Sequence, residues 1–356
     1  MLNTCLLLSL SILPIYVGDT PAWGGFRGNN GSGVVEGSPI PDQFDLEENL
    51  LWKVDALPGY SSPIVNAGRV YITAAAGTKL STHCLDLGTG EQVWAQEIAF
   101  DGKRVGANSS ASPTPATDGE RLYTLFHHVG MVCYDLDGKE LWRNDLGAPF
   151  NLPHGLSTSP VVHGDSVIIQ VDQDTNSHLL ALDAKTGKTL WNTDRSGSTH
   201  SYATPVIYTP KEGPAQIIVS GSNQIAGYAL ATGKRIWWVD GAAWQSKSLP
   251  LIHGDLCIVN SYMVSTSEFG GPRVTQSWQE CLVERDANDS GFIEREEWDD
   301  TAMMQAWFIF DLDGDDKLNE DDFNYLKNAG SAVGGLFAVK MDGQGNVTES
   351  HIAWRY

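Results

Sequence analysis

The sequence predicts an all-β fold built from repeated, four-stranded antiparallel units. Its 356 residues include 37 glycines and 16 prolines. Short runs of Val, Ile, Thr and Tyr lie between these turn residues, a pattern that favours strands over long helices. Two further markers recur together every 42 to 50 residues. A period in the forties that holds four short strands is typical of one blade of a β-propeller.

The first marker is a tryptophan that closes each unit. Its fullest copy is A-L-D-A-K-T-G-K-T-L-W, from Ala181 to Trp191. This motif predicts two strands joined by a tight turn, in which Asp accepts hydrogen bonds from the turn amides and Gly supplies the positive φ. The tryptophan recurs at Trp52, Trp94, Trp142, Trp191 and Trp237, at spacings of 42, 48, 49 and 46 residues. The next candidate, Trp354, follows 117 residues later.

The second marker is a residue followed by proline at the start of an apolar strand. It occurs at Ser62-Pro63, Ser112-Pro113, Ser159-Pro160, Thr204-Pro205 and Leu249-Pro250, at spacings of 50, 47, 45 and 45 residues. A single blade cannot bury both faces of its sheet, so blades pack face to face around an axis. We expect each recurring tryptophan to wedge between neighbouring blades at their outer strands.

The hairpin motif resembles the repeat of pyrroloquinoline-quinone (PQQ) enzymes and of the related outer-membrane assembly lipoprotein of the BamB type. The copies that carry the resemblance are D-L-G-T-G-E-Q-V-W (Asp86 to Trp94), D-A-K-T-G-K-T-L-W (Asp183 to Trp191) and A-L-A-T-G-K-R-I-W (Ala229 to Trp237). The resemblance covers about residues 50–267 and 335–354. It implies a bacterial, exported, PQQ-like β-propeller.

The pattern divides the chain into five segments. Residues 1–18 contain the apolar run Leu6 to Val17, which has the length of a signal peptide and is too short to span a membrane. We therefore expect export to the periplasm or the cell exterior. The other segments are a lead-in at 19–49, propeller blades at 50–275, an insertion in the fifth blade at 276–330, and the propeller continuation at 331–356.

The propeller is predicted to be incomplete. Leu50 to Asp55 are expected to form the outer strand of the last blade, supplied by the N-terminal part of the chain. The sequence stops two residues after Trp354, before the inner strands that should receive this outer strand. We therefore expect a truncated chain or an open, arc-like array of blades.

Charge and cysteine usage exclude some classes of function. The net charge of −21 argues against a nucleic-acid partner, because phosphate binding needs a basic surface. Fifteen acidic and three basic residues lie between Glu284 and Asp322, so the excess charge is local. No apolar stretch reaches the length of a transmembrane segment. Cys84 and Cys133 fall at matching places in two repeats, which indicates buried strand residues rather than disulfide partners.

The most specific chemical signal is an acidic loop inside the insertion, which interrupts the β pattern between Ser261 and Gly335. Helices are expected at Gln276 to Arg285 and Thr301 to Phe310, each running into such a loop. The first loop, Asp286 to Glu297, fits the twelve-residue EF-hand calcium pattern, with Gly291 at the sharp turn. Its expected Ca²⁺ ligands are Asp286, Asn288, Ser290, the Phe292 carbonyl, Glu294 and Glu297.

The second loop, Asp311 to Asp322, departs from the pattern at two positions. Asp316 replaces the turn glycine, and Asp322 is one methylene shorter than the usual closing Glu. Mg²⁺ is therefore an alternative occupant, and an acidic loop that binds no ion is the other interpretation. The expected ligands are Asp311, Asp313, Asp315, the Lys317 carbonyl and Asp322. Ile293 and Leu318 occupy matching positions, where paired EF-hand loops join in a short β contact.

Two classes of function follow from these features. The favoured one is a non-enzymatic, calcium-binding propeller that holds a protein or polysaccharide partner. Five polar residues near the blade entries either line a mouth that binds such a partner or are solvated loop residues; they are Asn108, His154, His200, Gln245 and Lys247. The alternative is a PQQ-dependent oxidoreductase whose site is completed by further C-terminal sequence. The resemblance implies adjacent cysteines in a quinone pocket, and the sequence contains no such pair, so PQQ is not expected and no catalytic residue is assigned.

Overall fold

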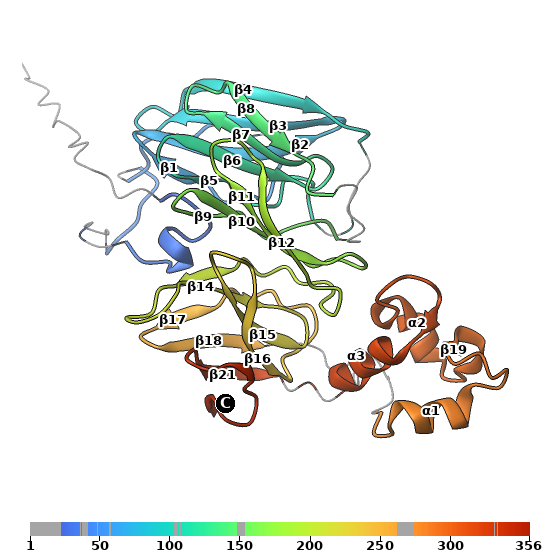
Figure 1. The fold of residues 1–356 in the computed structure, drawn as a ribbon. Helices are drawn as coiled ribbons and strands as arrows, with labels where there is room; N and C mark the ends of the chain where they lie inside the picture. Colours follow the sequence, from blue (N-terminus) through green and yellow to red (C-terminus); the bar gives the residue numbers. More distant parts are fainter. Residues whose placement is uncertain are drawn as a thin grey trace, which may run out of the picture.

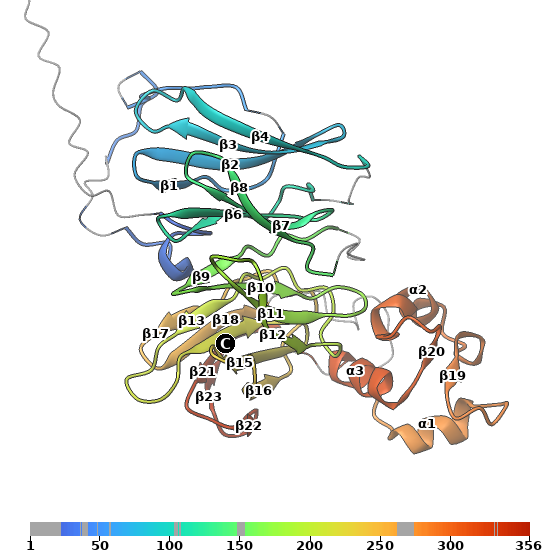
Figure 2. The same cartoon turned by 45° about the horizontal axis from the view of Figure 1, so that its top comes forward.

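Five sheets, each with four antiparallel strands in sequence-neighbour order, form the body of the protein, and the fourth sheet carries one further, parallel strand (Figure 1). The computed structural model describes residues 23–35, 37, 42–47, 49–56, 58–102, 106, 108–147, 154–261, 274–330, 332 and 334–356. The predicted signal segment lies outside these residues. The sheets follow one another in chain order along an open arc, with the first and fifth sheets apart in both views (Figures 1 and 2). The predicted propeller blades are confirmed.

Each blade is a simple meander of neighbouring strands. The first blade contains β1 (Ile64–Asn66), β2 (Arg69–Ala76), β3 (Lys79–Asp86) and β4 (Gln92–Ala99), and the second β5 (Ala116–Thr117), β6 (Arg121–Phe126), β7 (Gly130–Asp135) and β8 (Glu140–Asn144). The third contains β9 (Val161–His163), β10 (Ser166–Val171), β11 (His178–Asp183) and β12 (Thr189–Asp194). The fourth contains β13 (Val206–Tyr208), β14 (Gln216–Ser220), β15 (Gln224–Ala229) and β16 (Arg235–Asp240). The fifth contains β17 (Leu251–His253), β18 (Leu256–Ser261), β21 (Gly335–Lys340) and β23 (Ile352–Arg355).

The recurring tryptophan joins each of the first three blades to the next blade along the chain. The indole N–H groups of Trp94, Trp142 and Trp191 donate to carbonyls in the hairpin turn of the following blade, at 2.9, 3.0 and 3.1 Å. Each ring also lies against the turn glycine of that blade. At Gly187, for example, a Cβ would lie 2.4 Å from the Trp142 ring, and φ is 69°. The glycine therefore permits both the turn and the close approach.

Trp52 makes the same contact without belonging to a strand. Its indole N–H donates to the Leu87 carbonyl at 2.8 Å, and its ring covers Gly90. Residues 50–56 form no strand, so the prediction of an outer strand at Leu50 to Asp55 is wrong. Among the described residues no strand pairs with this segment, and the tryptophan contact ties it to the first blade.

The fourth and fifth blades are joined differently. The Trp237 indole donates to Gln216 of its own blade at 2.8 Å. The strand β22 (Gly345–Asn346), from the long turn of the fifth blade, pairs in parallel with β16 instead. Trp354 holds the same register as the other tryptophans, opposite Ala338 at a bulge, and its side chain is 42% exposed.

A chain of hydroxyl groups connects the blade entries. The amide of Ser62 donates to Thr114 Oγ1, that of Thr114 to Ser159 Oγ, and that of Ser159 to Thr204 Oγ1, each at 3.0 Å. In the second blade the equivalent pair is therefore Thr114-Pro115, and the assignment of Ser112-Pro113 is wrong. The reason is that the hydroxyl must face the amide of the preceding blade, and Thr114 occupies that place.

The lead-in runs across the inner strands of the propeller. Trp23 pairs with Val65 of the first blade, and Gly24 accepts from the Thr117 amide of the second at 2.8 Å. The Asn30 side chain bonds both backbone groups of Ile207 in the fourth blade, at 2.6 and 2.7 Å. A single segment thus contacts three blades that are distant in sequence.

The core consists of several clusters between adjacent sheets rather than one centre. The cysteines in the described part of the chain, Cys84, Cys133, Cys257 and Cys281, are all buried and free, which confirms the prediction for Cys84 and Cys133. Three helices lie between β18 and β21: α1 (Trp278–Arg285), α2 (Thr301–Phe310) and α3 (Glu320–Gly330). Among the described residues, every helix is too short or too polar to cross a bilayer.

We expect the tryptophan junctions to carry much of the stability of the arc. Trp142→Ala removes a ring that is only 9% exposed and should lower the free energy of unfolding by about 3–5 kcal/mol. Trp354→Ala, in the same register but 42% exposed, should cost about 1 kcal/mol or less. Urea unfolding followed by circular dichroism measures both, and equal losses would contradict this account.

Candidate metal centre

The insert folds around its own apolar core. A capping box between Ser277 and Glu280 starts α1, because each satisfies a backbone N–H that the first turn leaves free. Large side chains from all three helices are buried together, among them Trp278, Trp307 and Phe323. This core places the two predicted acidic loops between successive helices, so that α2 serves both.

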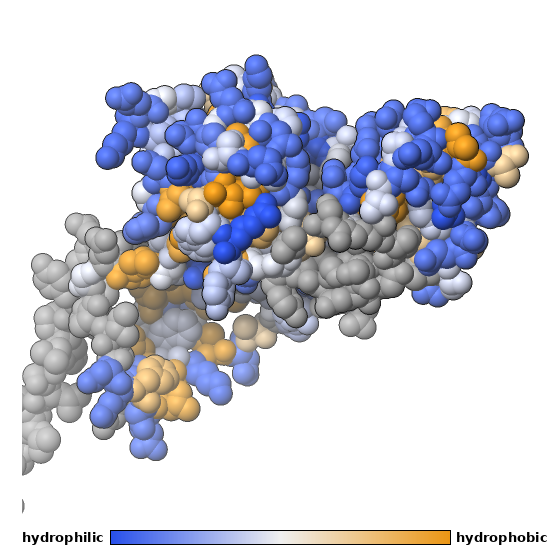
Figure 3. All heavy atoms as spheres, turned by 90° about the horizontal axis from the view of Figure 1, so that it is seen from below, coloured by the Kyte–Doolittle hydropathy of each residue, from blue (hydrophilic) through white to orange (hydrophobic). Residues whose placement is uncertain are grey.

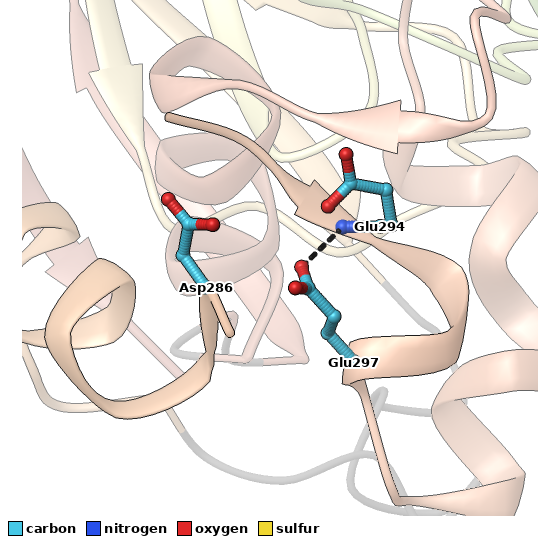
Figure 4. Close-up of side chains that lie close together, drawn as sticks. All are labelled: Asp286, Glu294 and Glu297. Atoms are coloured by element: carbon cyan, nitrogen blue, oxygen red, sulfur yellow. Dashed lines mark hydrogen bonds between the residues drawn. The ribbon is translucent and has the colours of Figure 1, made fainter. Parts of the chain in front are cut away.

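Three carboxylates of the first loop converge on one point (Figure 4). Asp286, Glu294 and Glu297 each place an oxygen within 4.8 Å of the others. Asp286 accepts from the amides of Ser290 and Gly291, at 2.9 and 2.8 Å. Glu297 accepts from the amides of Ala287 and Glu294, at 2.8 and 3.0 Å, and thereby closes the loop.

The second loop repeats this arrangement position by position. Asp311 accepts from the amides of Asp315 and Asp316, at 3.1 and 2.9 Å. Asp322 accepts from those of Leu312 and Asn319, both at 2.9 Å. The shorter Asp322 side chain therefore bridges the same two loop positions as Glu297. Asp311, Asp313 and Asp315 place oxygens within 4.8 Å of one another.

A short two-stranded sheet joins the loops. β19 (Ile293–Glu294) pairs antiparallel with β20 (Lys317–Leu318), and Ile293 lies opposite Leu318 as the sequence predicted. At the turn position, Gly291 has φ of 82° and Asp316 has φ of 65°. The Asp therefore adopts the left-handed conformation, at a cost of roughly 1–2 kcal/mol relative to an unstrained residue.

The remaining predicted ligands of the first loop lie around these carboxylates. The side chains of Asn288 and Ser290 bond Glu294 Oε2 at 3.4 and 3.2 Å, and the Phe292 carbonyl accepts from Ser290 Oγ at 3.4 Å. In the second loop, Lys317 pairs with Glu294 through β19 and β20. These positions are consistent with a ligand set made only of oxygens.

The ninth position distinguishes the two loops. Glu294 turns a carboxylate toward Asn288 and Ser290. Its counterpart Asn319 uses its side-chain oxygen to accept from Asp321 and Asp322 at the start of α3, at 2.8 and 3.1 Å. The second loop therefore provides one oxygen fewer for a cation.

Burial also separates the loops. Asp322 is 0% and Asp311 8% exposed, whereas the first loop is more open to solvent. Burial raises the pKa of the Asp322 carboxyl to about 6, and the neighbouring charges of Asp313 and Asp311 add to this effect. Burial also raises the pKa of Asp311. A buried carboxylate with a raised pKa is poorly stabilised when ionised, which is the situation that a bound cation relieves.

The five residues predicted to line a polar mouth have different surroundings. His154 and Lys247 are exposed, Asn108 and Gln245 are partly buried, and His200 is buried. His200 lies beneath the insert, with its ring 6.0 Å from that of Phe308. The contacts of the insert with the propeller, made also by Thr199 and Trp244, were not predicted, because single residues in loops carry no periodic signal.

The fold and the site together define a PQQ-like β-propeller with a helical, acidic insert. A family model described as "Outer membrane protein assembly factor BamB" matches residues 78–262, more than half of the chain. The chain belongs to this family. No curated protein sequence matches it.

Solved structures resemble this chain at low identity, and two of the three described next have TM-scores of 0.50 and 0.51. BamB from Moraxella catarrhalis is 19% identical over 59% of this chain and 57% of its own, with a TM-score of 0.42. A europium-containing methanol dehydrogenase is 16% identical over 64% and 50%, with a TM-score of 0.51. The quinohemoprotein alcohol dehydrogenase from Comamonas testosteroni is 16% identical over 70% and 49%, with a TM-score of 0.50. The chain spans about half the length of these proteins.

The raised pKa of Asp322 predicts a pH-dependent stability of the metal-free insert. Since the folded pKa of about 6 exceeds the unfolded value of about 3.9, the folded state binds more protons between these values. The free energy of unfolding should therefore fall as the pH rises from about 4 to about 6, and level off above. Urea unfolding in metal-free buffer, followed by tryptophan fluorescence, measures this. The Asp322→Asn variant should lose this dependence of stability on pH. The same pH profile in the variant as in the unaltered protein would contradict the prediction.

Proposed function

We propose that the insert is a pair of EF-hand calcium sites on an exported, non-enzymatic propeller that serves as a scaffold for a protein or polysaccharide partner. The observation that carries the calcium proposal is the matched geometry of the two loops. In each, the first and twelfth carboxylates are held by backbone amides at the same loop positions.

The chemistry of the loops favours calcium. Ca²⁺ takes six to eight hard oxygen ligands in flexible geometry, whereas Mg²⁺ requires near-ideal octahedral geometry. The first loop offers carboxylate, amide, hydroxyl and carbonyl oxygens, and every charged ligand is acidic. The second loop offers fewer oxygens, so Mg²⁺ is the stronger competitor there. The ion would neutralise carboxylates that now lie within 4.8 Å of one another.

The scaffold role is supported by the location of the clustered carboxylates. Both groups of clustered carboxylates found in the described part of the chain belong to the insert, outside the five blades. The insert, at the right in the view from below, is largely hydrophilic with small hydrophobic spots (Figure 3). Membership of the BamB family is consistent with a protein partner.

Titration calorimetry on the full chain tests calcium binding. We expect two sites, of which Glu297→Gln weakens the first by about 10- to 100-fold, because a charged ligand is lost. Asp322→Asn should weaken the second in the same way. Glu296→Gln and Asp321→Asn remove exposed neighbouring carboxylates and serve as matched controls. Binding that is unchanged in Glu297→Gln and Asp322→Asn would refute the assignment.

The non-enzymatic part of the proposal has a separate test. Purified protein incubated with PQQ, calcium, and an alcohol or sugar should not reduce an electron-accepting dye. Dye reduction that depends on both PQQ and substrate would establish the oxidoreductase instead.

A further inference from the structure

The insert touches the propeller through its second half. The hydroxyls of Tyr325 in α3 and Thr199 in the β12–β13 connection share a buried hydrogen bond of 2.8 Å. The Thr199 carbonyl in turn accepts from the Ser222 hydroxyl, and Ser222 accepts from the Gln245 amide at 3.2 Å. One side chain of the insert is thereby tied to three connections of the propeller.

Aromatic residues form a second contact. The ring of Phe308 in α2 meets that of His200 edge to face, with centroids 6.0 Å apart, and His200 Nε2 lies 2.6 Å from Asp174 Oδ1. The ring centroid of Trp244 lies 5.3 Å from that of His200. Trp244 is also buried in the same cluster as the core of the insert, so the two parts share apolar packing.

The second acidic loop is itself part of this interface. A Cβ at Gly314 would lie 3.2 Å from the Thr175 methyl of the β10–β11 turn. A cleft at this junction is lined by Ser196 and Gly197 of the propeller and by Asp313, Asp322 and Tyr325 of the insert. The first loop, beside β19, lies on the far side of the insert in both ribbon views (Figures 1 and 2).

A direct structural path links the cation loop to the docking contact. Asp322 lies in the first turn of α3 and holds the loop closed through Leu312 and Asn319. Tyr325 follows three residues later on the same helix, about one turn along it. Without a cation, the carboxylates of Asp311, Asp313 and Asp315 repel one another at close range, which opposes the closed loop from which α3 begins.

We propose that the cation of the second loop fixes the insert in its docked position on the propeller, and that its removal releases the insert while the blades stay folded. This inference rests on the proposed calcium binding. The docked insert covers Thr199, His200 and Trp244, which are 0%, 1% and 5% exposed. Calcium would therefore control access to this face of the propeller.

Hydrogen exchange of the full chain, with calcium and with a calcium chelator, tests the proposal. On calcium removal, amide exchange in residues 195–205 and 242–249 should accelerate by at least about tenfold. Exchange in residues 166–171, which form a buried strand of the third blade, should not change. The Asp322→Asn variant should show the fast exchange even with calcium, and Glu297→Gln should retain the slow exchange.

Further variants separate a docking effect from misfolding of the insert. Asp313→Asn removes an exposed ligand of the second loop and should act like Asp322→Asn. Thr199→Val should accelerate exchange at 242–249 while calorimetry still shows two calcium sites. Calcium binding at the second loop without any change in exchange would overturn the docking proposal and leave the proposed function intact. Absence of calcium binding would overturn both.

Discussion

The contact between a tryptophan indole and the hairpin turn of the next blade is the interaction on which the arc depends. It combines a hydrogen bond to a carbonyl with close packing on a glycine. A turn carbonyl near the edge of one sheet is thereby satisfied by the adjacent sheet, and the ring fills the space between them. Because Trp52 makes this contact from outside any strand, the contact itself, and not strand pairing, positions the segment before the first blade.

Two further features hold the inner side of the arc. The hydroxyl chain from Ser62 to Thr204 links four successive blade entries, and it ends where Leu249 offers no hydroxyl. The lead-in crosses the same region and bonds the inner strands through Val65, Thr117 and Ile207. Inner strands have unpaired backbone groups along one edge, which are costly to leave without partners. The lead-in satisfies part of this edge and fixes the spacing of the blades.

The sequence predicted the features that repeat and those that follow a ligand pattern. The tryptophan period located the blades, the insert was bounded at Ser261 and Gly335, and the loop pattern grouped Asp286 with Glu297. Features that depend on contact between distant segments were not predictable. Ser112 and Thr114 both precede proline, and only the position of Ser159 selects Thr114. The pairing of Tyr325 with Thr199, 126 residues apart, likewise leaves no local pattern.

The position of the insert explains how one chain combines a regular scaffold with separate chemistry. Ser261 and Gly335 are paired neighbours in the fifth blade, so the ladder of β18 and β21 continues as if a short turn joined them. The blade is therefore insensitive to what the connection contains. The two loops differ in surroundings as well as in ligands: the same bridge closes both, but Asp322 is buried beside the propeller and Glu297 is not. The buried loop beside the propeller is therefore the one that our proposal links to the docking of the insert.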